Sequence, residues 1–378
     1  MGDILQERNI RTSDFEGNPI FSLTIEDGVT PKTDRYERTS LITKTEDLFK
    51  IVSPNEFVTN PMNLRFGAFG YNKNSFSVCV SGYYDVFSID NDKCSGFWSS
   101  YFKTPIALKR FDDAATGSLI EKRRVKFSTL CQLVFLMPEE MKEKKQIAAF
   151  FDCLDSLITL HQRKYDKLCV LKKSMLDKMF PKGGSLYPEI RFAGFTDPWE
   201  QRKLGQHLKL SRELGHTGVD ARKLTVKLWG KGVVEKTDLY GGSAQTQYYI
   251  RHAGQFMYGK LDFLHAAFGV VPDKLDCFES TLDSPAFDIE GLDSSFLLNL
   301  VTQEDFYLKN GNIANGSRKA KRIHEETFLN MEIRAPELVE QRRIGAFFDR
   351  LDSLITLHQR KLELLRNIKK SMLDKMFV

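Results

Sequence analysis

The chain has 378 residues and a formal net charge of +5, and 42% of its residues are hydrophobic and 28% are charged. This length is more than one ordinary core requires and suits two domains, and the composition is typical of a folded protein rather than a disordered one. The longest apolar runs, such as Cys131 to Met137, are too short to cross a bilayer, and no signal-peptide pattern opens the sequence. We therefore expect a cytoplasmic protein, and the small positive charge permits a polyanionic partner without demonstrating one.

Residues 1–138 have the pattern of a mixed α/β domain, with short β-rich stretches separated by turn residues. The stretches expected to be strands are Phe21–Ile25, Phe57–Asn60, Val78–Val80, Asp85–Ile89 and Leu133–Leu136. A second segment of this kind, residues 182–337, is expected to contain strands at Leu224–Leu228, Gln247–Ile250, Phe256–Tyr258 and Met331–Ile333. Short shared sequences, such as Ala68-Phe69-Gly70 and Ala267-Phe268-Gly269, indicate that the two segments are diverged copies of one domain.

Each of these segments carries a run of basic residues shortly after a Gly-Ser pair. The basic residues are Lys122, Arg123, Arg124 and Lys126 in the first segment, and Arg318, Lys319, Lys321 and Arg322 in the second. Such side chains can hold DNA phosphates, and although each run alone could be a solvated loop, their matching positions favour a DNA contact. Residues that read base edges look like any other surface polar residue. Candidates for that role are Arg65, Lys73, Asn74 and Gln245.

Two long helices are predicted, one after each domain, at residues 139–181 and 338–378. Residues 150–180 recur at 347–377 with 24 of 31 positions identical, and both stretches have apolar residues at heptad spacing. A proline precedes each helix, at Pro138 and Pro336, and Pro181 closes the first. The residues expected on the buried seam are Ile147, Phe150, Leu154, Leu157, His161, Leu168 and Met175, and then Ile344, Phe347, Leu351, Leu354, His358, Leu365 and Met372.

The matching seams predict that the two helices pair with each other as an antiparallel coiled coil, although ordinary amphipathic helices in a bundle would show the same period. In the register that we expect, Ile147 lies nearest Met372 and His161 lies nearest His358. The predicted fold class is therefore α/β (α+β): two mixed α/β domains separated by two long antiparallel coiled-coil helices, within one internal repeat.

The sequence lacks the motifs that common catalytic and metal sites require. No C-x-x-C pair occurs among the six cysteines, and none of them has a histidine at ligand spacing, so no metal site is expected. Pro272-Asp273 is not followed by the acidic-x-Lys element of a Mg²⁺ nuclease, and Asn60-Pro61-Met62 is not the motif of a DNA amino-methyltransferase. No ATP-binding loop of the type G-x-x-x-x-G-K-[ST] is present either.

The segment from Pro188 through Trp199 to Gly205 resembles the opening of a recognition domain in type I restriction-modification specificity subunits. The helical endings, around Gln341 to Ile344 and Phe347 to Leu357, resemble regions of the same family. One departure is that Met1-Gly2-Asp3 aligns with Leu204-Gly205-Gln206, so the sequence contains no first copy of residues 188–203.

The resemblance implies a non-catalytic subunit that binds double-stranded DNA. In that family, each domain reads one half of a split site, the helices set the gap, and the subunit binds two methyltransferase subunits and restriction-translocase subunits. The resemblance implies no cofactor in this chain, with S-adenosylmethionine held by the partner methyltransferase. Two alternatives remain open from the residues alone: a fused restriction or methylation enzyme, and a coiled-coil scaffold that does not bind DNA.

Overall fold

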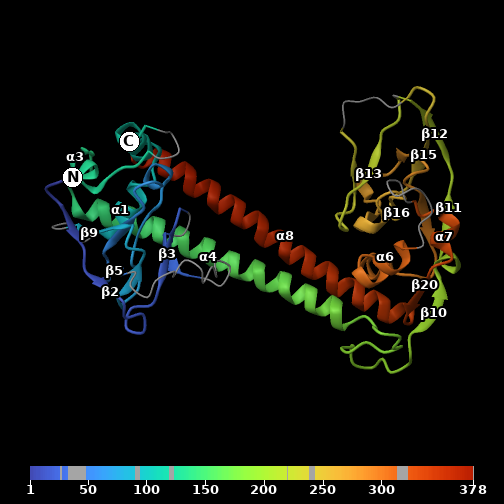
Figure 1. The fold of residues 1–378 in the computed structure, drawn as a ribbon. Coiled ribbons are helices and arrows are strands. Elements are labelled where there is room, and N and C mark those ends of the chain that lie inside the picture. Colours follow the sequence, from blue (N-terminus) through green and yellow to red (C-terminus); the bar gives the residue numbers. More distant parts are fainter. Residues whose placement is uncertain are drawn as a thin grey trace. The chain divides into compact units, whose positions relative to one another are not determined.

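The structure, a computed structural model, describes residues 1–25, 28–32, 48–89, 94–118, 123–218, 220–237, 243–312 and 322–377 (Figure 1). The chain divides into two compact units. Unit 1 contains residues 1–162 and 359–378, and unit 2 contains residues 163–358. Each unit therefore combines one α/β domain with part of each long helix.

The domain of unit 1 is built on two small antiparallel sheets and a hairpin. The larger sheet has the order β1-β9-β6-β7 and the smaller β2-β5-β8, while β3 pairs with β4. The strands are β1 (Leu5–Arg8), β2 (Arg11–Thr12), β3 (Phe21–Thr24), β4 (Gly28–Pro31), β5 (Phe49–Val52), β6 (Phe57–Thr59), β7 (Phe69–Tyr71), β8 (Val78–Val80) and β9 (Asp85–Ile89). Inward-facing Phe57, Phe69 and Phe87 pack at ring distances of 5.3 to 6.1 Å and form the centre of the core.

Three short helices cover this core: α1 (Ser95–Tyr101), α2 (Pro105–Ala114) and α3 (Phe127–Gln132). Helix α2 begins at Pro105, which occupies the first turn, and the preceding Thr104 hydroxyl caps it by accepting a hydrogen bond from the Ala107 amide at 3.3 Å. From α1, Phe97 and Trp98 are almost fully buried. The aromatic residues that are so frequent in the sequence are thus used to fill a small core.

Unit 2 repeats this topology strand for strand. Its sheets have the orders β11-β19-β16-β17 and β12-β15-β18, β13 pairs with β14, and an additional pair, β10 with β20, has no strand counterpart in unit 1. The strands are β10 (Glu200–Lys203), β11 (Leu208–Ser211), β12 (Leu214–Thr217), β13 (Leu224–Val226), β14 (Val233–Glu235), β15 (Gln247–Arg251), β16 (Phe256–Tyr258), β17 (Phe268–Val270), β18 (Phe278–Ser280), β19 (Ala286–Ile289) and β20 (Glu332–Ala335). The helices are α5 (Ser294–Val301), α6 (Glu304–Gly311) and α7 (Glu325–Leu329).

Individual hydrogen bonds confirm which residues of the two units are equivalent. The Val125 amide donates to the Pro61 carbonyl at 2.9 Å in unit 1, and the Ile323 amide donates to the Lys260 carbonyl at 3.1 Å in unit 2. Likewise, the Met1 amino group donates to the Leu133 carbonyl, as the Leu204 amide does to the Met331 carbonyl, both at 2.9 Å. Met1 therefore occupies the position of Leu204, as the sequence alignment predicts.

The two long helices are α4 (Met141–Lys178) and α8 (Leu338–Lys375), and they run antiparallel within each unit (Figure 1). In unit 1, the rings of Phe151 and Phe377 lie 5.8 Å apart, and Asp155 forms an ion pair with Lys369. In unit 2, Lys172 pairs with Asp352 at 2.6 Å, and the rings of Phe180 and Phe348 lie 6.1 Å apart. The predicted antiparallel pairing is confirmed.

The register of this pairing differs from the expected one. Because Phe151 contacts Phe377 and Asp155 pairs with Lys369, Met372 lies level with residues between 151 and 155 rather than with Ile147. The shift is about two helical turns, which is about one heptad. A heptad pattern looks the same after a shift of seven residues, so the pattern alone could not distinguish the two registers. The expected pairing of His161 with His358 joins residues of different units and stays a prediction.

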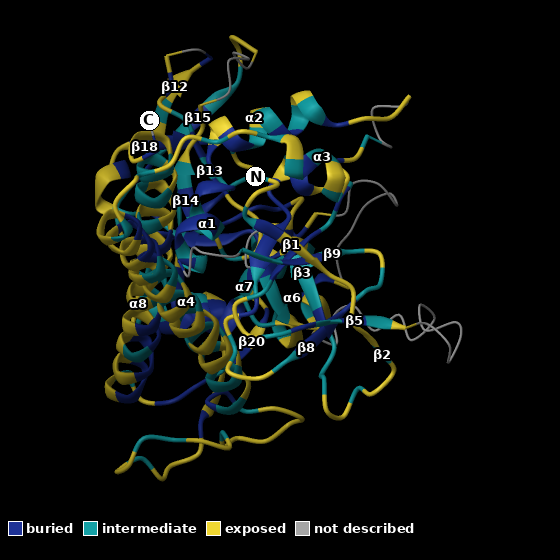
Figure 2. Ribbon diagram, turned by 90° about the vertical axis from the view of Figure 1, so that its left-hand side faces the viewer, coloured by how far each residue is buried: buried dark blue, intermediate teal, exposed yellow. Residues whose placement is uncertain are grey.

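Burial along the predicted seam is concentrated near the domains. Ile147, Leu154, Ile344 and Leu351 are buried, and Leu168, Met175, Phe347, Leu365 and Met372 pack against the two domain cores. Phe150, Leu157 and Leu354 are more than a third exposed. Figure 2 shows exposed residues along much of both helices. The helix ends are therefore held mainly by the aromatic cores of their own units.

The strand expected at Leu133–Leu136 is absent, and this prediction was wrong. Residues 133–138 have no regular secondary structure, whereas their equivalents in unit 2 form β20, which pairs with β10 in the register Lys203 to Glu332. Strand β10 directly precedes Leu204, whose equivalent is Met1, so the described residues include no partner for residues 134–137. The other expected strands agree with observed strands to within two residues at either end.

Among the described residues, no helix combines the length and the apolar character needed to span a membrane.

Candidate DNA interface

The basic runs predicted to contact DNA are only partly within the described residues. Lys122, Arg318, Lys319 and Lys321 lie outside them. Arg124 and Arg322 are described and exposed, and they occupy equivalent positions. Arg124 directly precedes buried Val125, whose amide bonds to Pro61, and Arg322 directly precedes buried Ile323, whose amide bonds to Lys260. The sequence matched the two basic runs, and the structure shows that Arg124 and Arg322 are the equivalent residues within them.

The two arginines are positioned by backbone contacts next to them. Arg124 exchanges two backbone hydrogen bonds of 3.0 Å with Thr116, which fixes the chain while leaving the guanidinium exposed. Arg322 lies 3.8 Å from the carboxylate of Asp283, in an exposed ion pair that water screens. Lys126 is also exposed, one residue before α3. All three cationic groups can reach a phosphate without disrupting the fold.

Arg123 has a different environment, although it is adjacent to Arg124. Its guanidinium donates to the carbonyls of Asp112 and Ala115 at 2.8 to 3.2 Å, at the carboxyl end of α2. The Asp112 carbonyl also accepts a hydrogen bond from the Ala115 amide at 3.2 Å, and the carboxyl end of a helix favours a positive charge. Arg123 therefore caps α2, which is a structural role.

Arg65, a candidate for base contact, also belongs to this corner of unit 1. It forms a 3.0 Å ion pair with Asp112, its guanidinium lies 4.4 Å from the centre of the Phe66 ring, and only 10% of its side chain is exposed. Lys73 pairs with Asp152 of α4 at 3.0 Å. Burial disfavours the Lys73 ammonium, but Tyr71 and Asp152 outweigh that effect and raise its pKa.

The remaining two candidates differ in their surroundings. Asn74 donates through its backbone and its side chain to the Asn72 carboxamide, at 3.0 and 2.9 Å. Gln245 is exposed in the loop before β15, and its amide donates to the Ser243 hydroxyl at 3.3 Å. Within unit 1, Arg65 shares Asp112 with Arg123, whereas Lys73 and Asn74 have other partners. Gln245 belongs to unit 2.

The hairpin between β13 and β14 presents an exposed aromatic residue that sequence reasoning missed. Trp229 is 56% exposed and lies between the exposed lysines Lys227 and Lys231. Its backbone has φ +61°, a conformation that is unfavourable for a residue with a side chain. Trp229 and Gly230 donate backbone hydrogen bonds of 2.8 Å to the carbonyls of His265 and Ala266, which holds the turn in place.

The exposed tryptophan is thus displayed by a rigid turn, and its ring meets the His265 ring edge to face at 5.6 Å. The equivalent corner of unit 1 presents Phe66, which is 52% exposed, at the position of His265. Aromatic rings between basic residues are typical of nucleic-acid contacts, where they stack on bases or insert between them. The signal in the sequence was the Lys-Leu-Trp-Gly-Lys turn between two strands.

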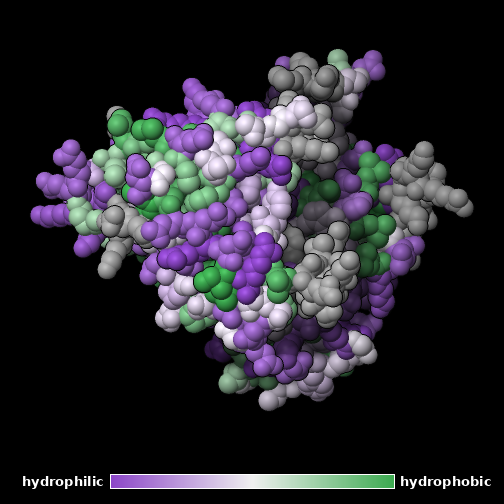
Figure 3. All heavy atoms as spheres, turned by 60° about the vertical axis from the view of Figure 1, so that its left-hand side comes forward, coloured by the Kyte–Doolittle hydropathy of each residue, from purple (hydrophilic) through white to green (hydrophobic). Residues whose placement is uncertain are grey.

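A groove of about 1040 Å³ lies in unit 2, between the segment after α4, helix α6 and strand β20. Its lining mixes basic residues such as Lys182, Lys309 and Arg334 with acidic residues such as Glu304 and Asp305. This mixture does not favour a polyanion over other ligands. On the face seen in Figure 3, hydrophilic side chains predominate and hydrophobic ones form separate groups.

No protein-family model matches the chain. The sequence is 24% identical over 265 residues to the type I restriction enzyme MjaVIII specificity subunit of Methanocaldococcus jannaschii. That alignment covers 62% of this chain and 59% of the relative, so it spans less than two thirds of the relative's length.

A solved structure shares the fold over the full chain. The S subunit of a type I restriction-modification system from M. genitalium superposes with a TM-score of 0.62 at 11% identity, covering 100% of this chain and 94% of that one. The HsdS subunit from Thermoanaerobacter tengcongensis gives a TM-score of 0.47 at 14% identity, covering 100% and 95%. The chain is therefore similar in sequence to a type I restriction enzyme specificity subunit, and similar in fold to the S subunit of a type I restriction-modification system.

Proposed function

We propose that this chain is the DNA-recognition subunit of a type I restriction-modification complex. Each α/β domain reads one half of a split double-stranded DNA site, and the paired helices α4 and α8 carry the two domains. The observation that carries the proposal is the duplication: two domains of one topology, each followed by a near-identical long helix, in a chain with this relative and this fold. Two copies of one domain with diverged surfaces suit a bipartite, asymmetric site.

The chemistry of the complex is assigned to its partners, in the cytoplasm. Methyltransferase subunits supply S-adenosylmethionine and the methyl transfer, restriction subunits cut the DNA, and this chain contributes binding and orientation. Exposed apolar residues on the helices, including Leu157, Leu160 and Leu357, provide surface for such partners. Arg124 and Arg322 bind phosphates, whereas Trp229 and Phe66 contact bases, one in each half-site.

The test is to map methylated adenines in cells that carry this chain with its cognate methyltransferase. The proposal predicts one bipartite motif that disappears when the chain is deleted. Trp229→Ala should relax the half of the motif read by unit 2 and leave the other half unchanged, and Phe66→Ala should do the reverse. Methylation that persists without the chain, or a motif without a gap, would contradict the proposal.

A DNA-binding subunit can also be separated from a scaffold that holds proteins only. In a gel-shift measurement with the methyltransferase present, binding should weaken steeply as salt rises, because phosphate contacts release counterions. A complex that assembles normally but binds no DNA at low salt would favour the scaffold.

A further inference from the structure

Three side chains of unit 2 with metal-binding atoms come together at one end of the β12-β15-β18 sheet. His252 follows β15, while Asp276 and Cys277 lie directly before β18. The two strands pair antiparallel with Arg251 opposite Phe278, and the Cys277 amide donates to the Arg251 carbonyl at 2.9 Å. This register places residues 252 and 277 opposite each other, so the sheet itself fixes their proximity.

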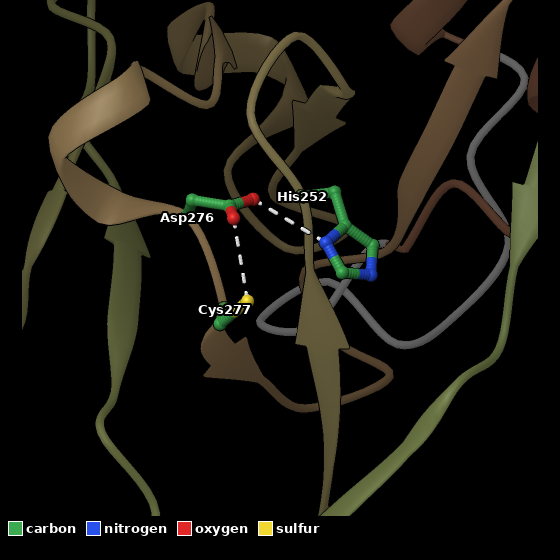
Figure 4. A group of neighbouring side chains, drawn as sticks. All are labelled: His252, Asp276 and Cys277. Carbon is green, nitrogen blue, oxygen red and sulfur yellow. Dashed lines mark hydrogen bonds and ion pairs between the residues drawn. The ribbon is translucent and has the colours of Figure 1, made fainter.

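The donor atoms of the three side chains converge. In Figure 4 the Asp276 carboxylate lies between the other two, with His252 Nδ1 3.3 Å from Oδ1 and Cys277 Sγ 3.3 Å from Oδ2. One atom from each residue lies within 4.8 Å of the others. Around a tetrahedral zinc ion, bonds of about 2.0 to 2.3 Å separate such donors by about 3.3 to 3.8 Å. The donors, within 4.8 Å of one another, would have to close by at most about 1 Å to accept an ion.

Neighbouring groups hold two of the three donors in this geometry. Nε2 of His252 lies 2.9 Å from the carboxylate of Glu213, and Asp276 Oδ1 accepts a hydrogen bond of 2.9 Å from the Ala253 amide. Glu213 is itself fixed, since its carbonyl accepts from the Ile250 amide at 2.9 Å. A carboxylate on the second nitrogen of a ligating histidine orients the ring and leaves the first nitrogen free to bind a metal.

We propose that His252, Asp276 and Cys277 bind one divalent transition-metal ion of the zinc class, with water in the fourth position. One nitrogen, one oxygen and one thiolate sulfur are the ligands that zinc takes, whereas Mg²⁺ and Ca²⁺ take oxygen ligands. The bound ion ties the end of β15 to the start of β18. Glu213 orients His252 without touching the ion.

The first experiment is a cobalt titration of the reduced, tag-free full chain. Co²⁺ bound to a thiolate gives a near-ultraviolet charge-transfer band, which we expect to saturate at one ion per chain and to disappear when Zn²⁺ is added. Cys277→Ser should abolish this band, whereas Cys153→Ser, at another exposed cysteine, should leave it unchanged. No saturable band, or a band that survives Cys277→Ser, would overturn the proposal.

Variants of the other two positions test the geometry. His252→Ala should weaken cobalt binding more than Glu213→Gln, which should retain the band with an affinity lowered by about tenfold. The side chains of Glu213 and Cys277 are exposed and that of His252 is partly exposed, so we expect each variant to fold. Thermal unfolding without metal checks this. Zn²⁺ should raise the melting temperature of the unmodified chain and not that of Cys277→Ser, and chelation should reverse the rise. An equal rise in both proteins would place the ion elsewhere.

Discussion

Lys172 on α4 donates to both carboxylate oxygens of Asp352 on α8, at 2.6 and 2.8 Å. The repeat carries the same pair a second time, because Asp155 and Lys369 are the residues equivalent to Asp352 and Lys172. The same contact therefore recurs in each unit, and neither pair would form if the helices shifted by one heptad. These ion pairs select the register that the apolar seam leaves undetermined.

Reversing one charge of this pair tests its role. We expect Lys172→Asp to lower the free energy of unfolding by about 1 kcal/mol, since partly exposed pairs contribute about 0.2 to 1 kcal/mol and the variant also adds repulsion. The double variant Lys172→Asp with Asp352→Lys should recover most of the loss. Denaturant unfolding of the two single variants and the double variant measures the coupling, and additive effects would exclude a role for the pair.

The neighbours Arg123 and Arg124 should behave differently when each is replaced by alanine. Arg124→Ala should weaken DNA binding at all sequences alike and reduce the salt slope by about one, with the melting temperature unchanged. Arg322→Ala is the matched variant in unit 2 and should give the same result. Arg123→Ala should instead destabilise unit 1 by about 1 to 2 kcal/mol, because the last carbonyls of α2 lose their cap. If Arg124→Ala left affinity and salt slope intact, that loop would be merely solvated.

Residues 134–137 should accept a strand that is attached in front of Met1. Among the described residues, the backbone groups of Phe135 and Met137 form no hydrogen bond, while the carbonyls of Val134 and Leu136 are bonded to Arg110 and Tyr101 on the other side. We expect that fusing a copy of residues 188–203 before Met1 raises the stability of unit 1 by about 1 to 2 kcal/mol. It should also slow amide exchange at Phe135 and Met137.

The fused segment offers two controls. Arg202→Pro within the added copy should remove the gain, because proline cannot donate to the new strand pair. Glu143→Ala should remove part of it, since Glu143 is equivalent to Glu340, whose buried carboxylate pairs with Arg191 at 2.7 Å in unit 2. Equal stability with and without the proline would show that no strand forms.

Helix length should set the gap between the half-sites if the proposed function is correct. Seven residues inserted after Lys164 and seven after Lys361 return every seam residue to the same face and lengthen each helix by about 10 Å, or some three base pairs. The half-site sequences should stay the same while the unread gap of the methylated motif grows. Insertions of three or four residues should impair folding, because the seam turns to another face. An unchanged gap in a folded, active seven-residue variant would show that these helices do not set it.

The sequence by itself determined the repeat, the two long helices and their antiparallel pairing, because these rest on local periodicity and on identity between distant segments. It also matched the two basic runs that contain Arg124 and Arg322, whereas the equivalence of these two arginines came from the structure. It could not determine the helix register, because one heptad resembles the next, whereas contacts such as Asp155 with Lys369 and Lys172 with Asp352 remove the ambiguity.

Only the tertiary structure decided which neighbouring basic residue is exposed and which is not. Arg123 and Arg124 are adjacent and alike in the sequence, but α2 presents its carbonyls to one of them and not to the other. The strand at Leu133–Leu136 failed for the same kind of reason, since a strand requires a partner that its own residues do not specify. His252 and Cys277 likewise meet only because β15 and β18 pair in one register, which no spacing between the two residues reveals.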